Sequence, residues 1–140
     1  MQRSAMRELA FQLINGLEMQ KNEDVLEQAQ MFIETNDITD EKVMQYLKDI
    51  CQGLQEHTDE INHLIENNLK ENWSLNRVSK INLSLIKISI YEMLYKKIPY
   101  KVAINEVVEL AKKYSDDTAP TFINGILASV VKEKNLSEKD

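Results

Sequence analysis

The residues that could bind a metal are few. Glu60 and His63 match the Glu-x-x-His element of di-iron helical bundles, but such sites need a second element of this kind and further carboxylates. No second Glu-x-x-His occurs in the sequence. His57 and His63 are six residues apart, which places them on different sides of a helix. One cysteine and two histidines cannot form a zinc cluster, so we expect no metal and no cofactor.

Nucleophilic catalysis has one candidate thiol, Cys51. It shares an apolar helix face with Leu47, Ile50 and Leu54, where a cysteine behaves as a small hydrophobic residue and burial raises the pKa of its thiol. The sequence contains no Gly-x-Ser-x-Gly, no Gly-rich phosphate loop and no dinucleotide-binding fingerprint. We therefore expect no catalytic residues, and a binding protein rather than an enzyme.

Phosphate binding is the chemistry that remains. Arg3 and Arg7 are four residues apart and share one face of a predicted helix, as two solubilising charges or as a phosphate clamp. Residues 77–113 carry eight basic and three acidic residues, a net charge of +5, whereas residues 9–76 have a net charge of −10. The whole chain of 140 residues has a net charge of −6. This balance argues against a solitary, tight RNA binder but is compatible with a small basic face.

Aromatic side chains next to such a basic face would add stacking on RNA bases. Tyr100 and Phe122 are the candidates, although Phe122 fits a core position equally well. We expect a cytoplasmic protein, because the N-terminus lacks the apolar stretch of a secretory signal and no window approaches about 18 consecutive apolar residues.

The elements that must position these residues are predicted to be helices. Apolar residues recur at helical spacing, and only three glycines and two prolines are available for turns. The first predicted helix begins near Ser4, the second covers residues 25–36, and the next two begin after N-caps at Thr39 and Thr58. The polar segment 71–80 is a connector.

The connector at 71–80 divides one domain, 1–140, into two predicted helical subdomains. These subdomains cover residues 1–72 and 73–133, and a frayed tail follows at 134–140.

The segment 81–94 is the most ambiguous part of the pattern. Its alternation and β-branched residues are typical of a strand, but the apolar pattern changes phase at Leu85-Ile86 and continues for too many residues. We predict a helix that is apolar on most sides and lies at the centre of the fold. Pro99 ends this element, and Pro120 stands near the start of the last helix.

Several motifs resemble the NusB family of transcription antitermination factors. The strongest are Ile98-Pro99-Tyr100-Lys101-Val102-Ala103-Ile104-Asn105-Glu106 and Phe122-Ile123-Asn124-Gly125, in this order and at this separation. Residues 85–92, Trp73 and the opening Arg7-Glu8-Leu9-Ala10-Phe11-Gln12 also match.

The resemblance implies an all-α fold of about seven helices in two subdomains and a role without catalysis. Members of the family pair with NusE, a small-subunit ribosomal protein, and the pair binds the boxA element of nascent RNA. The complex docks on RNA polymerase with other Nus factors and suppresses premature termination, notably in ribosomal RNA operons. Single-stranded RNA of this kind is recognised through exposed bases and phosphates.

The resemblance also implies roles for individual residues. The RNA-binding residues would be Arg3, Arg7, Tyr100, Lys101 and Phe122. The residues that dock NusE would be Asn82, Leu85 and Lys87.

Three further family matches are interpreted as structural. Asn105 and Asn124 would cap or cross-link helices, and Gly125 would permit close approach of two helices.

Two other functions stay open. An accessory RNA-binding domain of a ribosomal RNA cytosine methyltransferase would share the fold and would require an attached catalytic domain. A purely protein-binding helical scaffold, such as a homodimer that hides its RNA-binding face, is compatible with the acidic surface.

Overall fold

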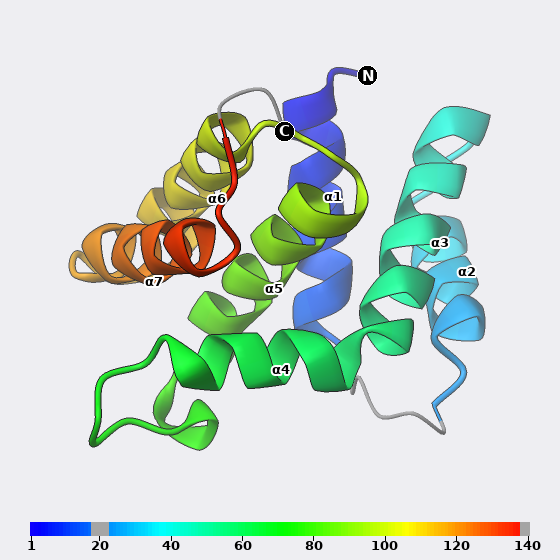
Figure 1. The fold of residues 1–140 in the computed structure, drawn as a ribbon. Coiled ribbons are helices and arrows are strands. Elements are labelled where there is room, and N and C mark those ends of the chain that lie inside the picture. Colours follow the sequence, from blue (N-terminus) through cyan, green and yellow to red (C-terminus); the bar gives the residue numbers. More distant parts are fainter. Residues whose placement is uncertain (18–22, 138–140) are drawn as a thin grey trace. The chain divides into compact units, whose positions relative to one another are not determined.

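The computed structural model describes residues 1–17 and 23–137. Within these ranges the chain is all-α, as predicted, with seven α-helices and no strand (Figure 1). The helices are α1 (Arg3–Asn15), α2 (Val25–Thr35), α3 (Glu41–Glu56), α4 (Thr58–Asn67), α5 (Lys80–Tyr95), α6 (Tyr100–Tyr114) and α7 (Ala119–Glu133), and a short 3-10 helix, η1 (Leu75–Arg77), precedes α5. None of the described helices combines the length and the apolar character needed to cross a membrane.

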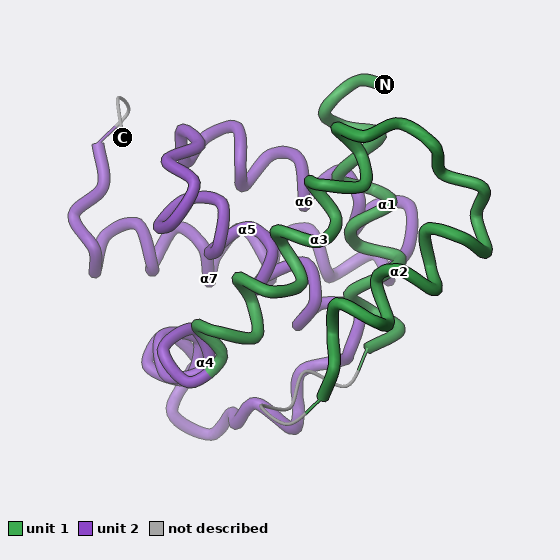
Figure 2. The backbone as a smooth tube through the Cα atoms, turned by 90° about the vertical axis from the view of Figure 1, so that its right-hand side faces the viewer, with its two compact units in different colours: residues 1–58 green, residues 59–140 purple. Residues whose placement is uncertain are grey.

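The chain forms two compact units, residues 1–58 and 59–140 (Figure 2). In the first unit α3 packs against α1 and α2, and in the second α5, α6 and α7 pack against one another. The division falls at the start of α4, whereas the sequence predicts it after residue 72. The reason is that the end of α4 is bonded to α7: Asn68 Nδ2 donates to Glu133 Oε1 over 3.0 Å, and Asn68 Oδ1 accepts from Ser129 Oγ over 2.5 Å.

The helix starts of the first unit differ in detail from the prediction. The N-cap of α3 is Asp40 rather than Thr39, and its Oδ1 accepts from the backbone N of Lys42 over 2.9 Å. Thr58 lies at the first residue of α4, where its Oγ1 donates to the carbonyl of Leu54 over 2.8 Å instead of capping the new helix. A carboxylate serves better at the start of α3, because it also interacts with the positive end of the helix dipole.

The segment predicted as a buried helix is α5. Its N-cap is Ser79, whose Oγ accepts from the backbone N of Asn82 over 3.2 Å. Side chains on every side of α5 are buried, including Leu85, Ile86 and Ile88. A helix buried all round needs apolar residues all round, which explains why its sequence lacks the clear stripe of a surface helix.

The start of α7 is fixed by a polar turn. Asp116 Oδ1 accepts from the backbone N of Thr118 and of Ala119, each over 3.0 Å, and from the Thr118 hydroxyl over 2.7 Å. These bonds lower the pKa of the Asp116 carboxyl, and the bond from the Thr118 hydroxyl has the largest effect. Pro120 follows at the first turn of the helix, as predicted, where its missing N–H costs nothing.

Candidate RNA-binding surface

Helix α7 separates two grooves of the second unit. Residues on one side of α7 face α6, and residues on its other side face the end of α4 and the connector. We call the first the α6–α7 groove and the second the aromatic groove. Helical periodicity explains the division, because positions three and four apart share a face while adjacent positions diverge.

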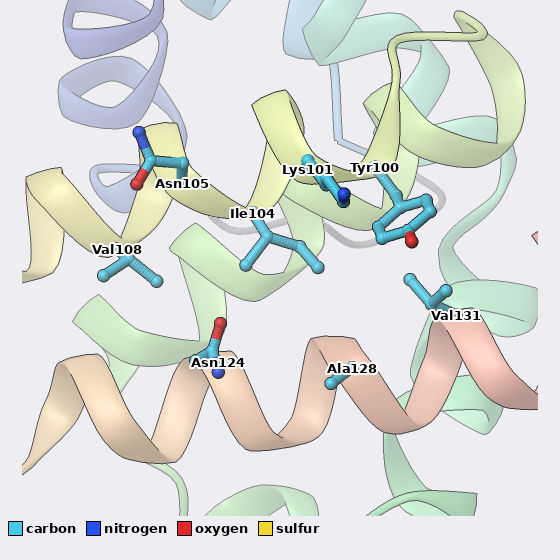
Figure 3. Close-up of a pocket in the computed structure, with 8 residues that line it drawn as sticks. All are labelled: Tyr100, Lys101, Ile104, Asn105, Val108, Asn124, Ala128 and Val131. Carbon is cyan, nitrogen blue, oxygen red and sulfur yellow. The ribbon is translucent and has the colours of Figure 1, made fainter. Parts of the chain in front are cut away.

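The α6–α7 groove has a volume of about 450 Å³ (Figure 3). It is lined by Tyr100, Lys101, Ile104, Asn105, Val108, Asn124, Ala128 and Val131. Ile104 and Val108 point from α6 toward α7, and Asn124 and Val131 point back from α7 (Figure 3). Lys101, Asn105 and Asn124 are exposed, so an apolar floor carries one cation and two amides that can donate and accept hydrogen bonds.

The aromatic groove has a volume of about 460 Å³ and is lined mainly by uncharged residues. They are Asn68, Leu69, Lys70, Trp73, Thr121, Phe122, Gly125, Ile126 and Ser129. The ring centroids of Trp73 and Phe122 are 5.9 Å apart with an interplanar angle of 40°. Trp73 is 46% exposed, which is unusual for so large an apolar side chain.

Gly125 lies in the middle of α7 and faces the aromatic groove. A Cβ built at this position meets no heavy atom within 4 Å. The prediction that Gly125 permits close approach of two helices is therefore wrong, because no neighbouring helix of the described chain reaches it. The missing side chain instead leaves open space between Trp73, Phe122 and the helix backbone.

The two arginines predicted to form a clamp on α1 have opposite environments. Arg3 is exposed, whereas Arg7 is 1% exposed and has interactions within the protein. The expectation that both guanidinium groups share an exposed face is wrong. Residue spacing places two side chains on one helix face, but it does not tell whether that face is covered.

The structure places the remaining predicted RNA-binding residues on the two grooves of α7. Tyr100 and Lys101 line the α6–α7 groove, and Phe122 lines the aromatic groove. Tyr100 and Phe122 are half-buried, so each ring has an accessible part. Tyr100 and Lys101 therefore lie together, and Phe122 lies on the other side of α7.

The residues predicted to dock NusE all belong to α5, and they differ in accessibility. Leu85 is 0% exposed and cannot contact a partner directly, which corrects that part of the prediction. Asn82 is half-buried, and its Oδ1 accepts from Ser115 Oγ over 2.7 Å, so its side chain links α5 to the end of α6. Lys87 is half-buried, and desolvation lowers the pKa of its ammonium group.

Glu60, a candidate metal ligand, is hydrogen-bonded to another side chain, and Cys51, the candidate nucleophile, is buried. Tyr95 OH donates to Glu60 Oε2 over 2.6 Å, and burial together with this carboxylate raises the pKa of Tyr95. Across the described residues no cluster of three His, Cys, Asp or Glu could hold a metal ion. Cys51 is fully buried, and burial raises the pKa of its thiol to about 12, so the thiolate is not populated at neutral pH.

Sequence reasoning missed three residues that line these grooves. Trp73 is identified from the sequence only as a match to the family, and Asn105 and Asn124 are predicted to have structural roles, yet both asparagines are exposed. Two signals could have found them: a tryptophan inside a polar connector, and asparagines three or four residues from apolar residues on the same helix face. Both signals depend on knowing which neighbouring elements leave that side open.

Comparisons with known proteins converge on one family. The sequence profile described as the NusB family matches residues 4–132. The chain is 45% identical to the transcription antitermination protein NusB of Ruminiclostridium cellulolyticum over 94% of this chain and 90% of that protein. The structure resembles T. maritima NusB, with a TM-score of 0.84 and 31% identity, over 95% of this chain and 92% of that one.

A third comparison concerns the fold alone. A solved structure of the antitermination factors NusB and NusE in complex with double-stranded RNA aligns with a TM-score of 0.81 and 24% identity. The alignment covers 94% of this chain and 96% of that one.

Proposed function

Because the chain belongs to the NusB family, we propose that it is a transcription antitermination factor that binds boxA RNA together with NusE. In this role it helps RNA polymerase, in a complex with other Nus factors, to pass terminators. It acts in the cytoplasm by binding and without catalysing a reaction. The observation that carries the proposal is the match of the family over residues 4–132, and relatives that carry the antitermination name rather than a methyltransferase name support it.

The α6–α7 groove is where we place the main phosphate contact. Lys101 is exposed at the start of α6, and it lies beside Tyr100 and the amides of Asn105 and Asn124. A cation can bind a phosphate, while amides and a phenol ring can contact bases or sugars. The net charge of −6 limits indiscriminate RNA binding, so a local contact of this kind needs a partner to give affinity.

The proposal is tested by measuring the affinity of the purified protein for single-stranded boxA RNA with and without NusE. We expect weak binding by the protein alone and markedly tighter binding when NusE is present. Absence of RNA binding in both conditions would contradict the proposal. NusE binding without any RNA binding would favour the protein-binding scaffold, and tight, NusE-independent binding to ribosomal RNA would favour the accessory-domain function.

A charge-matched pair of variants tests the position of the phosphate contact. Lys101→Ala should weaken RNA binding and reduce the slope of log K against log salt by about 0.7. Lys112→Ala removes the same charge from the same helix, outside the groove, where Lys112 Nζ forms an exposed pair with Glu109 at 2.9 Å. We expect Lys112→Ala to change the slope little. Equal slopes for both variants would show that net charge, and not the groove, matters.

A further inference from the structure

A shallow groove lies between α1 and α2 in the first unit. Both helices pack against α3, whereas they make few contacts with each other, and the space between them has a volume of about 240 Å³. We call this space the α1–α2 groove. Among the described residues its lining is uncharged and mostly apolar, and it includes Leu13, Leu17, Met31 and Phe32.

Met31 is the most accessible part of this lining. It is 60% exposed, more than any other large apolar side chain on the described helices. The half-buried ring of Phe32 follows it in α2 and lines the same groove. A flexible thioether next to an aromatic ring can adapt to apolar partners of different shapes. The groove therefore presents an apolar surface that is open to a ligand.

The α2 wall of the groove is fixed at both ends. At its start, Gln55 Nε2 of α3 donates to the carbonyl of Glu23 over 2.6 Å. At its end, Asn36 Nδ2 donates to the carbonyl of Phe32 over 2.8 Å. A wall that is already ordered binds a partner without the entropic cost of becoming ordered.

The charge around the groove indicates the chemistry of that partner. Residues 23–41, which include all of α2, contain seven acidic residues and no basic residue. Glu27 and Glu34 are exposed, and they lie four residues before and three residues after Met31, so helical spacing places all three on one face of α2. An RNA phosphate would be repelled by these carboxylates, whereas a protein segment rich in lysine or arginine would be attracted.

The two units differ in net charge in the same sense. Residues 59–140 contain twelve basic and twelve acidic residues, so residues 1–58 carry the whole net charge of −6. A symmetric dimer through the α1–α2 groove would bring two such units together, and their repulsion disfavours a second copy as the occupant.

We propose that the α1–α2 groove docks a basic amphipathic helix of a protein partner. Apolar side chains on one face of that helix cover Met31 and Phe32. Lysines or arginines that flank this apolar face pair with Glu27 and Glu34. This surface adds a protein contact to the proposed RNA-binding function and does not depend on it.

The first test uses a helical peptide of leucines and lysines, with the leucines on one face, as the probe. Fluorescence anisotropy of the labelled peptide measures its affinity for the full chain, and the methyl signals of 13C-labelled methionines report where it binds. We expect binding, with a shift of the Met31 methyl signal along the same binding curve. A peptide with glutamate in place of lysine should bind about 10-fold more weakly or less. Absence of binding, a Met31 signal that does not move, or equal affinity for both peptides would overturn the proposal.

The second test compares two apolar side chains of α2. Met31→Ala should weaken binding of the leucine–lysine peptide by about 10-fold, because the Met31 side chain becomes buried only in the complex. Leu26→Ala is the matched control, since Leu26 is 38% exposed on the same helix and does not line the groove. Its affinity should equal that of the wild type. Equal losses in the two variants, each shown to be folded by thermal unfolding, would overturn the proposal.

The third test removes a carboxylate from the end of α2. Glu34→Gln should be at least as stable as the wild type, because the helix dipole disfavours an acid in the last turn, and a glutamine can keep the bond that Gln30 Nε2 donates over 3.3 Å. We expect peptide affinity to fall by about 2- to 5-fold at low salt and its salt dependence to become shallower.

Glu56→Gln is the matched control for this charge. Glu56 is exposed at the last residue of another helix, α3, so its replacement changes the net charge and the helix end in the same way. Its peptide affinity should stay close to that of the wild type. Equal effects of the two variants would show that net charge alone attracts the peptide and would overturn the docking site.

The methionine spectra also distinguish other occupants of the groove. A shift of the Met31 signal on dilution of the protein alone would make the groove a contact between two copies, and a shift on adding boxA RNA alone would make it an RNA contact. Competition between NusE and the peptide would assign the groove to NusE. Each of these results would overturn the proposal, whereas we expect the peptide to bind the NusE complex as tightly as the free protein. Failure of boxA RNA to bind would contradict the proposed function and leave this docking site intact.

Discussion

The N-terminal helix α1 and the C-terminal helix α7 both carry residues that sequence analysis connects with RNA, but the two helices use them differently. Of the two arginines of α1, Arg7 is buried and Arg3 is exposed. On α7 and its neighbours, amides, two lysines and three aromatic rings line grooves that are open to solvent. A cationic side chain is thus hidden in one region while apolar rings are exposed in the other.

This difference shows that the type of a residue does not predict whether its side chain is accessible to a ligand. A buried guanidinium cannot reach a phosphate, and its truncation is costly because the packing of its long stem and its interactions are lost together. An exposed tryptophan does not contribute the favourable free energy that burial of its ring would give to folding. A ligand that covers the ring gains this free energy on binding. Each region can be tested by variants that separate folding from binding.

The largest effect is expected for Arg7→Ala. Removing this buried side chain should lower the free energy of unfolding by about 3 kcal/mol or more, because the substitution leaves a void and removes the interactions of Arg7 within the protein. For a chain of this size that corresponds to a fall in melting temperature of about 10 °C, measured by thermal unfolding. The salt dependence of RNA binding, measured where the variant is folded, should be unchanged.

A second substitution separates the charge of Arg7 from its volume. Arg7→Met fills much of the same space without the guanidinium, so a smaller loss of stability than in Arg7→Ala would assign part of the effect to packing. If Arg7→Ala instead kept the wild-type melting temperature and flattened the salt dependence of RNA binding, Arg7 would be a phosphate contact and the contrast with α7 would fail.

Much of the fold could be predicted from the sequence, because helices depend on local signals. The apolar spacing indicates where the helices lie, and the change of phase at Leu85-Ile86 identifies α5 as a buried helix. The exact caps were harder to predict, since Thr39 and Asp40 are both good N-cap residues and only the observed backbone selects Asp40.

The candidate site was less predictable, because burial depends on residues far away in the sequence. Arg7 and Leu85 lie on helix faces that other segments cover, and no local pattern reports such cover. At Gly125 the sequence predicts cover where there is none: a glycine in a helix indicates a closely packed neighbouring helix, but open space lies beside it. Lys101 and Tyr100 are adjacent at the start of α6, so their position beside each other depends only on local structure.

A smaller effect on stability is expected for Gly125→Ala. Alanine is more favourable than glycine in a helix interior by about 1 kcal/mol, and the new Cβ meets nothing in the folded chain. The melting temperature should therefore rise by about 3 °C. Gly16→Ala is a useful comparison, because Gly16 is the C-cap of α1 rather than a helix-interior residue. A Cβ there would make an ordinary van der Waals contact with the carbonyl oxygen of Leu13 at 3.5 Å, so we expect a smaller rise in melting temperature than for Gly125→Ala. A lower melting temperature for Gly125→Ala would show that α7 is packed more closely than the open groove indicates.

The smallest effect on stability is expected for Arg3→Ala, and it completes the comparison on α1. Arg3 is exposed in the first turn of the helix, where a positive charge gains nothing from the helix dipole, so the free energy of unfolding should change by less than about 0.5 kcal/mol. If Arg3 contacts a phosphate, the slope of log K against log salt should fall by about 0.7, as for Lys101→Ala. An unchanged slope would remove α1 from the RNA-binding surface and leave the grooves beside α7 as its main part.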